Sequence, residues 1–215
     1  MPASPKVSVL IPLYNRKKFI VRAIDSILNQ SYKNFEIIII DDGSTDNVEK
    51  VLLPVIKPEK KTTYIRHTNR GPALSLNEGM KLAKGEFITF LDSDDEYGKN
   101  HLSKRLKYFK DNPGTDLTYS TAKIIGNEKD MYVPDARNPK ELIHLDDCII
   151  GGTFFGKKEV FDKLNGFRDI YAYDYDFHKR AVKKFKVVKL DIPTYIYYRN
   201  TSDSILTHLK KKHGN

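Results

Sequence analysis

Strand-like and helix-like segments alternate through residues 7–91 with little chain between them. Short apolar runs predict four strands, at 7–13, 35–40, 63–67 and 87–91. Apolar residues at helical spacing predict a helix between each pair of strands. The first covers about 19–28, the second is short and ends near residue 54, and the third covers about 72–83. Single helices between successive strands imply right-handed crossovers. The pattern therefore predicts an α/β fold with a Rossmann-like, mostly parallel, doubly wound sheet and helices on both faces.

The second half of the chain is less regular. Helices are expected at about 100–109, 160–164 and 176–185, and strands at 116–121, 187–190 and 195–198. Residues 126–147 mix Gly, Pro, Asn and charge, so we expect an irregular excursion there. Neither a repeat nor a linker interrupts the sequence. We therefore expect one domain over 1–215, with halves at about 1–98 and 99–215.

Composition limits the classes of partner and site. The chain has 37 Lys and Arg against 28 Asp and Glu, a formal net charge of +9, but the basic residues are mostly scattered. Because no recognition motif accompanies them, we expect no nucleic-acid partner. The one cysteine, Cys148, excludes an internal disulfide framework and a Cys-rich zinc site. No apolar run reaches the roughly 18–20 residues of a membrane-spanning helix. A cytoplasmic location is expected, and the basic run Lys210–Lys212 allows peripheral contact with the inner face of a membrane.

Polar residues directly follow each of the four expected strands. They are Tyr14-Asn15, Asp41-Asp42, His67–Arg70 and Asp92–Asp95. In doubly wound sheets, ligands bind beyond the carboxyl ends of the strands, so these groups are expected to meet at one edge. Asn15 is also a candidate N-cap of the first helix, as Ser44 or Thr45 is of the second.

The segment 91–95, Leu-Asp-Ser-Asp-Asp, places three carboxylates directly after an apolar strand. The charges of Asp92, Asp94 and Asp95 repel one another unless something neutralises them. Oxygen ligands without a nearby Cys or His favour Mg²⁺ or Mn²⁺ over zinc. The alternative is an acid-rich helix N-terminus stabilised by the helix dipole, which accounts for one or two acids more readily than three.

Asp41 and Asp42 form a second acidic pair at a strand end, followed by Gly43 at a sharp turn. Paired carboxylates there point to recognition of a donor group, such as a base N–H or a ribose hydroxyl. The sequence contains no G-x-x-x-x-G-K-[ST] motif, and no G-x-G-x-x-G motif after the first strand. This disfavours a kinase-like NTPase and a dinucleotide-dependent dehydrogenase.

Several short motifs occur in a fixed order along the chain. They are Pro12-x-Tyr14-Asn15, DDGSTD at 41–46, Asn69-Arg70-Gly71, GEFI at 85–88 leading into LDSDD at 91–95, and Gly166-Phe167. Together they resemble the inverting family 2 glycosyltransferases of GT-A fold, over nearly the whole chain. The resemblance implies a single GT-A-like domain whose second half binds the acceptor and supplies the catalytic base.

The resemblance also implies which residues bind the donor. Pro12, Tyr14 and Asp42 would contact the nucleobase, usually uracil, with Asn15 in the same nucleotide-binding set. Arg70 would lie near the nucleotide.

The carboxylates after the fourth strand would serve the diphosphate. Asp92 and Asp94 would hold the ribose and a Mn²⁺ or Mg²⁺ ion on the diphosphate, with Asp95 as a reserve ligand. Tyr198 and Arg199 resemble the closing Y-Y-R segment of the family, which covers the donor diphosphate.

The general base of the family would match Asp174, in the segment 173–177, with Asp176 its nearest competitor. The reaction implied is metal-dependent, inverting transfer of a hexosyl or N-acetylhexosaminyl group from a nucleotide-sugar, a UDP-sugar favoured. The acceptor would be a hydroxyl of a glycan, a lipid-linked sugar or a cell-surface polymer. Asp174 would take the proton of that hydroxyl.

Two departures from the family pattern keep an alternative open. Tyr173 replaces the usual acidic residue before the base, and Thr201 stands where many members carry a His, a contact that His208 could supply. The alternative is a catalytically degenerate GT-A-like module that binds nucleotide or glycan without turnover. A sugar nucleotidyltransferase is disfavoured, because residues 13–16 do not form the glycine-rich loop that it needs.

Overall fold

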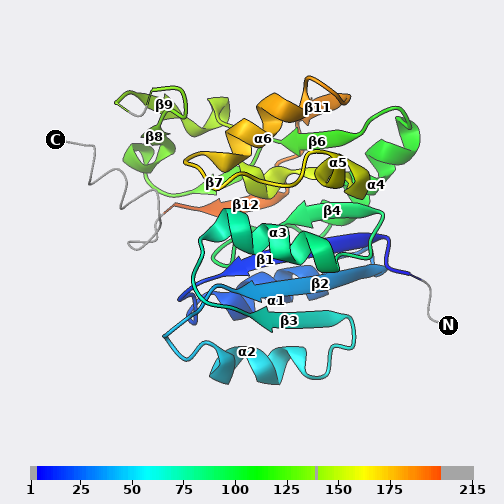
Figure 1. Ribbon diagram of the computed structural model, residues 1–215, viewed down its shortest axis with the longest axis vertical. Helices are drawn as coiled ribbons and strands as arrows, with labels where there is room; N and C mark the ends of the chain where they lie inside the picture. The colour runs from blue at the N-terminus through cyan, green and yellow to red at the C-terminus, as the bar shows by residue number, and fades with distance from the viewer. Residues whose placement is uncertain (1–3, 139, 200–215) are drawn as a thin grey trace.

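The computed structural model describes residues 4–138 and 140–199 and shows a seven-stranded sheet covered by helices (Figure 1). The strands, in sheet order, are β11 (Val187–Leu190), β6 (Leu117–Ser120), β10 (Phe155–Lys157), β4 (Phe87–Phe90), β1 (Val7–Leu13), β2 (Phe35–Asp41) and β3 (Thr62–Arg66). All neighbouring pairs are parallel except those that β10 makes with β4 and β6. The predicted mostly parallel, doubly wound sheet is therefore confirmed.

Helices cover both faces of this sheet. They are α1 (Ile20–Leu28), α2 (Glu49–Ile56), α3 (Pro72–Leu82), α4 (His101–Asp111), α5 (Lys158–Lys163) and α6 (Tyr173–Ala181). The alternation of side chains along β1 separates two cores: Val9 and Ile11 pack with α1, α2 and α4, whereas Leu10 packs with α3, α5 and α6. None of the described helices is long and apolar enough to span a bilayer.

The second half adds two small sheets. One has the order β5 (Glu96–Tyr97), β12 (Tyr195–Tyr198), β7 (Lys123–Ile125), and the other pairs β8 (Tyr132–Pro134) with β9 (Leu142–His144). Three short 3₁₀ helices accompany them, at Glu128–Met131, Leu145–Asp147 and Gly151–Thr153. The expected excursion at 126–147 is thus a hairpin flanked by 3₁₀ turns.

Both predicted N-caps in the first half are wrong. Helix α1 begins at Ile20 after Phe19, and α2 begins at Glu49 after Val48. Asn15 instead adopts a left-handed backbone with φ of 52°. Its Oδ1 accepts a hydrogen bond from the backbone N–H of Thr45 at 2.7 Å, and its own N–H donates to Ser44 Oγ at 3.0 Å. These polar side chains join two loops at the sheet edge instead of capping helices.

Helix α6 begins three residues earlier than expected, at Tyr173 instead of Asp176. Ala172 precedes it with a left-handed backbone, φ of 51°. The shift places Asp174 in the first helical turn, where the helix dipole favours its charged form.

Candidate active site

The carboxyl ends of β1, β2 and β4 point to the same side of the molecule (Figure 1) and adjoin a cavity of about 1070 Å³. It is lined by the loops after these strands and by segments 133–137, 147–152 and 170–175 of the second half. Nearly all of the residues that the sequence pointed to line this cavity. They are Pro12, Tyr14, Asn15, Asp42, Asp92, Asp94, Asp174, Tyr198 and Arg199. Arg70 and Asp95 are not among the lining residues.

Asp92 and Asp94 bring two carboxylates to the cavity. Burial, followed by the negative charge of Asp94, raises the pKa of Asp92 to about 7. The Tyr195 hydroxyl lies 3.1 Å from Asp92 Oδ2, and Arg16 Nε donates to Asp94 Oδ2 at 3.1 Å. Asp92 therefore resists ionising until a cation offsets the neighbouring charge.

Asp95 has a different position. It is fully buried, and its carboxylate accepts hydrogen bonds from Tyr195 Oη at 2.7 Å and from the backbone N–H of Tyr198 at 2.8 Å. It thereby holds β12 against the loop that follows β4. The structure does not bring Asp95 to the cavity as a reserve metal ligand.

These residues fit a metal ion that arrives with its ligand. Among residues 4–138 and 140–199, no three His, Cys, Asp or Glu side chains group closely enough to hold a metal alone. Mg²⁺ in nucleotide sites is commonly held by one or two carboxylates together with phosphate oxygens and water. Asp92 and Asp94 supply that many carboxylates, and the raised pKa of Asp92 is the electrostatic cost that a cation would remove.

Asp41 and Asp42 bond to the protein itself. Asp41 is fully buried and accepts from Ser44 N at 2.8 Å and Tyr64 Oη at 2.6 Å. The two oxygens of Asp42 accept the backbone N–H groups of Arg70 and Gly71, at 2.7 and 2.8 Å. The interpretation of Asp41 as a ligand-facing group is wrong, because its bonds shape the turn, whereas Asp42 still lines the cavity.

Arg70 contributes its backbone to this arrangement. Its guanidinium lies 3.7 Å from the Glu78 carboxylate on α3 and is about two-fifths exposed. Its side chain therefore points toward α3, and a role near the nucleotide stays a prediction.

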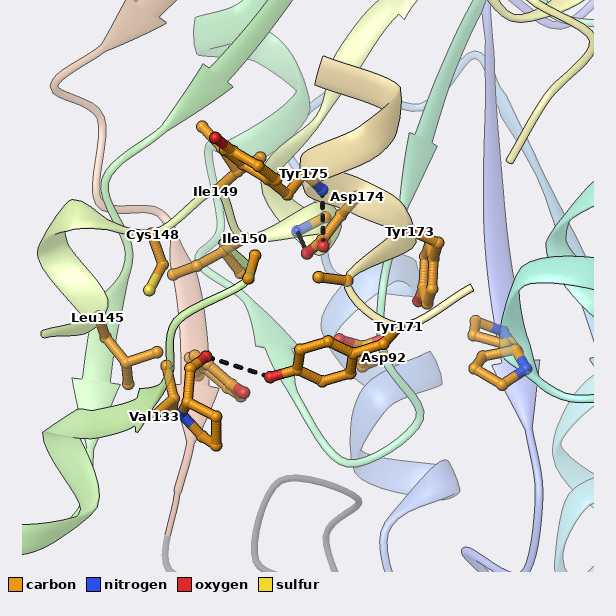
Figure 2. Close-up of a pocket in the computed structure, with 18 of the residues that line it drawn as sticks. Asp92, Val133, Leu145, Cys148, Ile149, Ile150, Tyr171, Tyr173, Asp174 and Tyr175 are labelled. Atoms are coloured by element: carbon orange, nitrogen blue, oxygen red, sulfur yellow. Dashed lines mark hydrogen bonds between the residues drawn. The ribbon is translucent and has the colours of Figure 1, made fainter. Parts of the chain in front are cut away.

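Asp174 lines the same cavity as Asp92, and both are labelled in Figure 2. Its Oδ2 accepts the backbone N–H of Gly151 at 3.1 Å, and its Oδ1 accepts that of Tyr175 at 2.8 Å. Burial raises the pKa of Asp174 above its ordinary value, although these two N–H groups oppose the shift. A half-buried carboxylate fixed in this way suits a general base.

Asp176, the competitor for that role, is already paired. Its carboxylate binds Arg168 at 3.2 Å and Arg180 at 2.8 Å, and it does not line the cavity. Arg180 also donates to the carbonyl oxygens of Leu164 and Gly166, at 2.7 and 2.8 Å. This network fixes the start of α6 and leaves Asp174 as the carboxylate that faces the cavity from this helix.

β12 brings the Y-Y-R segment to the cavity. The Tyr198 hydroxyl donates to Glu96 at 2.7 Å, and Arg199, 4% exposed, donates its backbone N–H to Ile125 at 2.7 Å. The expectations for Thr201, His208 and Lys210–Lys212 concern positions outside the described residues.

The comparisons with known proteins agree with this geometry. The sequence model described as Glycosyl transferase family 2 matches residues 8–201. The chain belongs to this family. An uncharacterized glycosyltransferase of Haemophilus influenzae is 41% identical over 186 residues, 85% of this chain and 74% of that protein. One of Rickettsia felis is 45% identical over 128 residues, 60% of this chain but only 21% of the relative's length.

Solved structures share the fold at low identity. TarS of S. aureus, residues 1–349 in complex with UDP-GlcNAc, has a TM-score of 0.73 at 22% identity and covers 94% of this chain and 60% of its own. The mannosyltransferase PcManGT of Pyrobaculum calidifontis, in complex with GDP-Man and Mn²⁺, has a TM-score of 0.70 at 20% identity, over 91% of this chain and 57% of its own. The GT-A-like fold expected for a family 2 member is therefore confirmed.

Two arginines that bind the acidic loop after β4 were not predicted from the sequence of this family 2 chain. Arg16 binds Asp94, and its position directly after Tyr14-Asn15 was a signal that could have revealed it. Arg22 on α1 donates to the backbone carbonyl of Asp94, lies 3.0 Å from the Glu96 carboxylate and stacks 3.8 Å from the centroid of the Tyr198 ring. Nothing in the amphipathic pattern of α1 distinguishes it from an ordinary surface arginine.

Proposed function

We propose that this protein is a metal-dependent, inverting glycosyltransferase that moves a sugar from a nucleoside diphosphate to an acceptor hydroxyl. One observation carries the proposal: Asp174 from the second half and the Asp92 and Asp94 pair from the first half line the same cavity. A metal ion held by Asp92 and Asp94 and a base at Asp174 could therefore act on the same bond.

The donor end of the site would bind the nucleotide. Pro12, Tyr14 and Asp42 would contact the base, a UDP-sugar being favoured, and Asp92 and Asp94 would hold Mn²⁺ or Mg²⁺ at the diphosphate. When bound, the cation would neutralise charge on the leaving diphosphate as a Lewis acid. The neighbours TarS and PcManGT were solved with UDP-GlcNAc and with GDP-Man and Mn²⁺, which supports a donor of this class.

The oxygen of the acceptor hydroxyl would form a bond to C1 of the sugar while the bond from C1 to the diphosphate oxygen breaks. Asp174 would accept the proton of that hydroxyl in the same step. Attack occurs opposite the leaving group, so one displacement inverts the configuration at C1. Burial favours this role because it raises the pKa of the carboxyl and so its basicity when ionised. A glycan, a lipid-linked sugar or a cell-surface polymer could present the hydroxyl, and a cytoplasmic location stays a prediction.

Thermal stabilisation by UDP, GDP, dTDP and CDP, each with and without Mn²⁺ or Mg²⁺, tests the donor end. A ligand at 100 times its Kd adds about 2.7 kcal/mol to the free energy of unfolding, a readily measured shift. We expect one nucleotide to stabilise the protein only with metal. Asp94→Asn should remove this gain, whereas Asp111→Asn, an exposed aspartate on α4 paired with Lys107, should retain it. Equal stabilisation without metal would exclude the metal role of Asp94.

A further inference from the structure

The part of the cavity beyond Asp174 is bordered by an apolar surface. We define the apolar wall as six lining side chains: Val133, Ile143, Leu145, Ile150, Ile170 and Tyr171. Figure 2 labels four of them, Val133, Leu145, Ile150 and Tyr171. Val133 and Leu145 are buried, while Ile170 and Tyr171 are 49% and 42% exposed. The hairpin of β8 and β9 and the loop before α6 therefore present aliphatic carbon to the ligand space.

This wall begins next to the proposed base. Ile150 directly precedes Gly151, whose N–H donates to Asp174 Oδ2 at 3.1 Å. On the other side, Tyr171 lies three residues before Asp174 and lines the same cavity. A group attached to the acceptor sugar would thus meet the wall soon after leaving the reacting hydroxyl.

The side chains of Tyr171 and Asp135, which line this part of the cavity, are already hydrogen-bonded within the protein. The Tyr171 hydroxyl donates to the backbone oxygen of Pro134 at 3.1 Å, the dashed line that reaches Tyr171 in Figure 2. The Asp135 carboxylate accepts three hydrogen bonds of 2.6–3.1 Å from the Arg137 side chain and one of 2.8 Å from the Arg137 backbone N–H. Sugar hydroxyls placed against this surface would lose water without gaining equivalent partners, which costs free energy.

The size of the cavity leaves room for a second ligand. Its volume of about 1070 Å³ slightly exceeds the roughly 300–1,000 Å³ typical of sites for one small ligand. Tyr175 and His178 on α6 also line it and offer polar atoms near Asp174. The site therefore has polar groups for an acceptor sugar, followed by a surface that suits hydrocarbon.

We propose that the acceptor is a sugar joined to a hydrocarbon chain, and that this chain packs on the apolar wall while the sugar hydroxyl faces Asp174. The inference rests on the proposed glycosyltransferase function and selects the lipid-linked class among its acceptors. The aliphatic character of five of the six wall residues favours an alkyl chain over an aromatic group.

Transfer to matched glycosides tests this acceptor class. Methyl, phenyl and octyl glycosides of glucose, galactose and N-acetylglucosamine are compared, with UDP-sugars as donors and octyl glycosides kept below micelle formation. We expect kcat/KM for the preferred octyl glycoside to exceed that of its methyl counterpart by at least about tenfold, since one methylene in an apolar pocket changes kcat/KM by about tenfold or more. Equal values for methyl and octyl, or a gain confined to phenyl, would overturn the proposal.

Substitutions at two equally exposed residues distinguish a specific effect of the apolar wall from a general effect of removing an apolar surface side chain. Ile170→Ser should bring the octyl value close to the methyl value, and Val182→Ser should leave the ratio unchanged, because Ile170 and Val182 are each 49% exposed but only Ile170 lines the cavity. Loss of the octyl preference in both variants, or in neither, would contradict a specific role of the wall.

Saturation-transfer NMR with octyl β-glucoside gives a readout that does not require turnover. The octyl protons should receive saturation from the unmodified protein and much less from Ile170→Ser; equal transfer to both would overturn the proposal. Failure of the glycosyltransferase function would look different: no nucleotide would stabilise the protein and no acceptor would be glycosylated, whatever the NMR result.

Discussion

Asp174 and Asp176 stand two positions apart on α6, yet their surroundings give them different chemistry. Within the described residues, Asp174 accepts hydrogen bonds from backbone N–H groups and lines the cavity, whereas Asp176 is paired with Arg168 and Arg180 and does not line it. A carboxylate that is bound to two guanidinium groups and lies outside the cavity is poorly placed to take a proton from an acceptor. Replacing each aspartate in turn by asparagine should therefore distinguish the role of Asp174 from that of Asp176.

Asp174→Asn should lower kcat by about 10²–10⁴-fold, the usual contribution of a general base, since an amide cannot take the acceptor proton. Nucleotide-dependent thermal stabilisation should persist, because the role proposed for Asp174 is at the acceptor and not at the nucleotide. Asp176→Asn is the control: it weakens the pairs with both arginines and should reduce stability more than the chemical step. Full activity of Asp174→Asn would place the base elsewhere.

The acid limb of the pH–rate profile should lie above pH 3.8, the ordinary pKa of an aspartate, since burial raises the pKa of Asp174 from that value. Protonation removes the base, so the rate falls as the pH drops through this raised pKa. Single-turnover rates are measured at donor and metal concentrations that saturate the protein at each pH, so the limb reports Asp174. A rate that stays constant down to pH 3.8, with the fold intact by circular dichroism, would contradict this assignment.

At the scale of elements, the 3₁₀ turn at Gly151–Thr153 and β12 depend on each other through Gly152 and Tyr195. A Cβ on Gly152 would lie 2.5 Å from Tyr195 Cζ and 2.6 Å from its Cε2. The Tyr195 ring is fully buried, and its hydroxyl contacts both Asp92 and Asp95. The absence of a side chain at 152 therefore permits the packing that orients the acidic loop.

Gly152→Ala should destabilise the protein by about 1–3 kcal/mol, as overpacking of a filled site does. It should also weaken nucleotide-dependent stabilisation, because Tyr195 moves with the loop. Gly114→Ala is the matched control: its Cβ would meet nothing nearer than Lys186 Nζ at 3.9 Å, so a change within about 0.5 kcal/mol is expected. Urea denaturation measures both, and equal effects would refute the packing argument.

The first four strands could be predicted because buried parallel strands are short, apolar and separated by amphipathic helices. The same regularity placed Asp42, Asp92 and Asp94 at one edge. Hydrogen bonds between loops could not be read in this way. Asn15 has the composition of an N-cap, but its side chain binds Thr45, a residue far along the chain that only the tertiary fold brings near. Likewise, the short hairpin at 132–144 has no periodicity to reveal it.

For the whole molecule, two halves of different character meet at one cavity. The first half contributes regular strand ends, and the second contributes α6, the hairpin and β12. Among the described residues, no three His, Cys, Asp or Glu side chains group closely enough to hold a metal ion. We therefore expect the metal to bind together with the nucleotide.

Chelation with EDTA should therefore leave the Tm of the ligand-free protein unchanged, while it abolishes the gain from the stabilising nucleotide. Adding Mn²⁺ in excess should restore that gain. Differential scanning calorimetry with and without nucleotide measures both. A fall in the Tm of the free protein upon chelation would mean that a structural ion is present.

The antiparallel strand β10 joins the two halves of the sheet, and this has a consequence for how the chain assembles. β10 comprises only Phe155–Lys157, yet it is the strand between β4 and β6. The first half can pair its strands as soon as residue 90 has been synthesised, but the second edge of β4 stays open until residue 155 emerges from the ribosome. An unpaired central strand attracts other strands, so nascent chains halted within this interval are the ones exposed to misassociation.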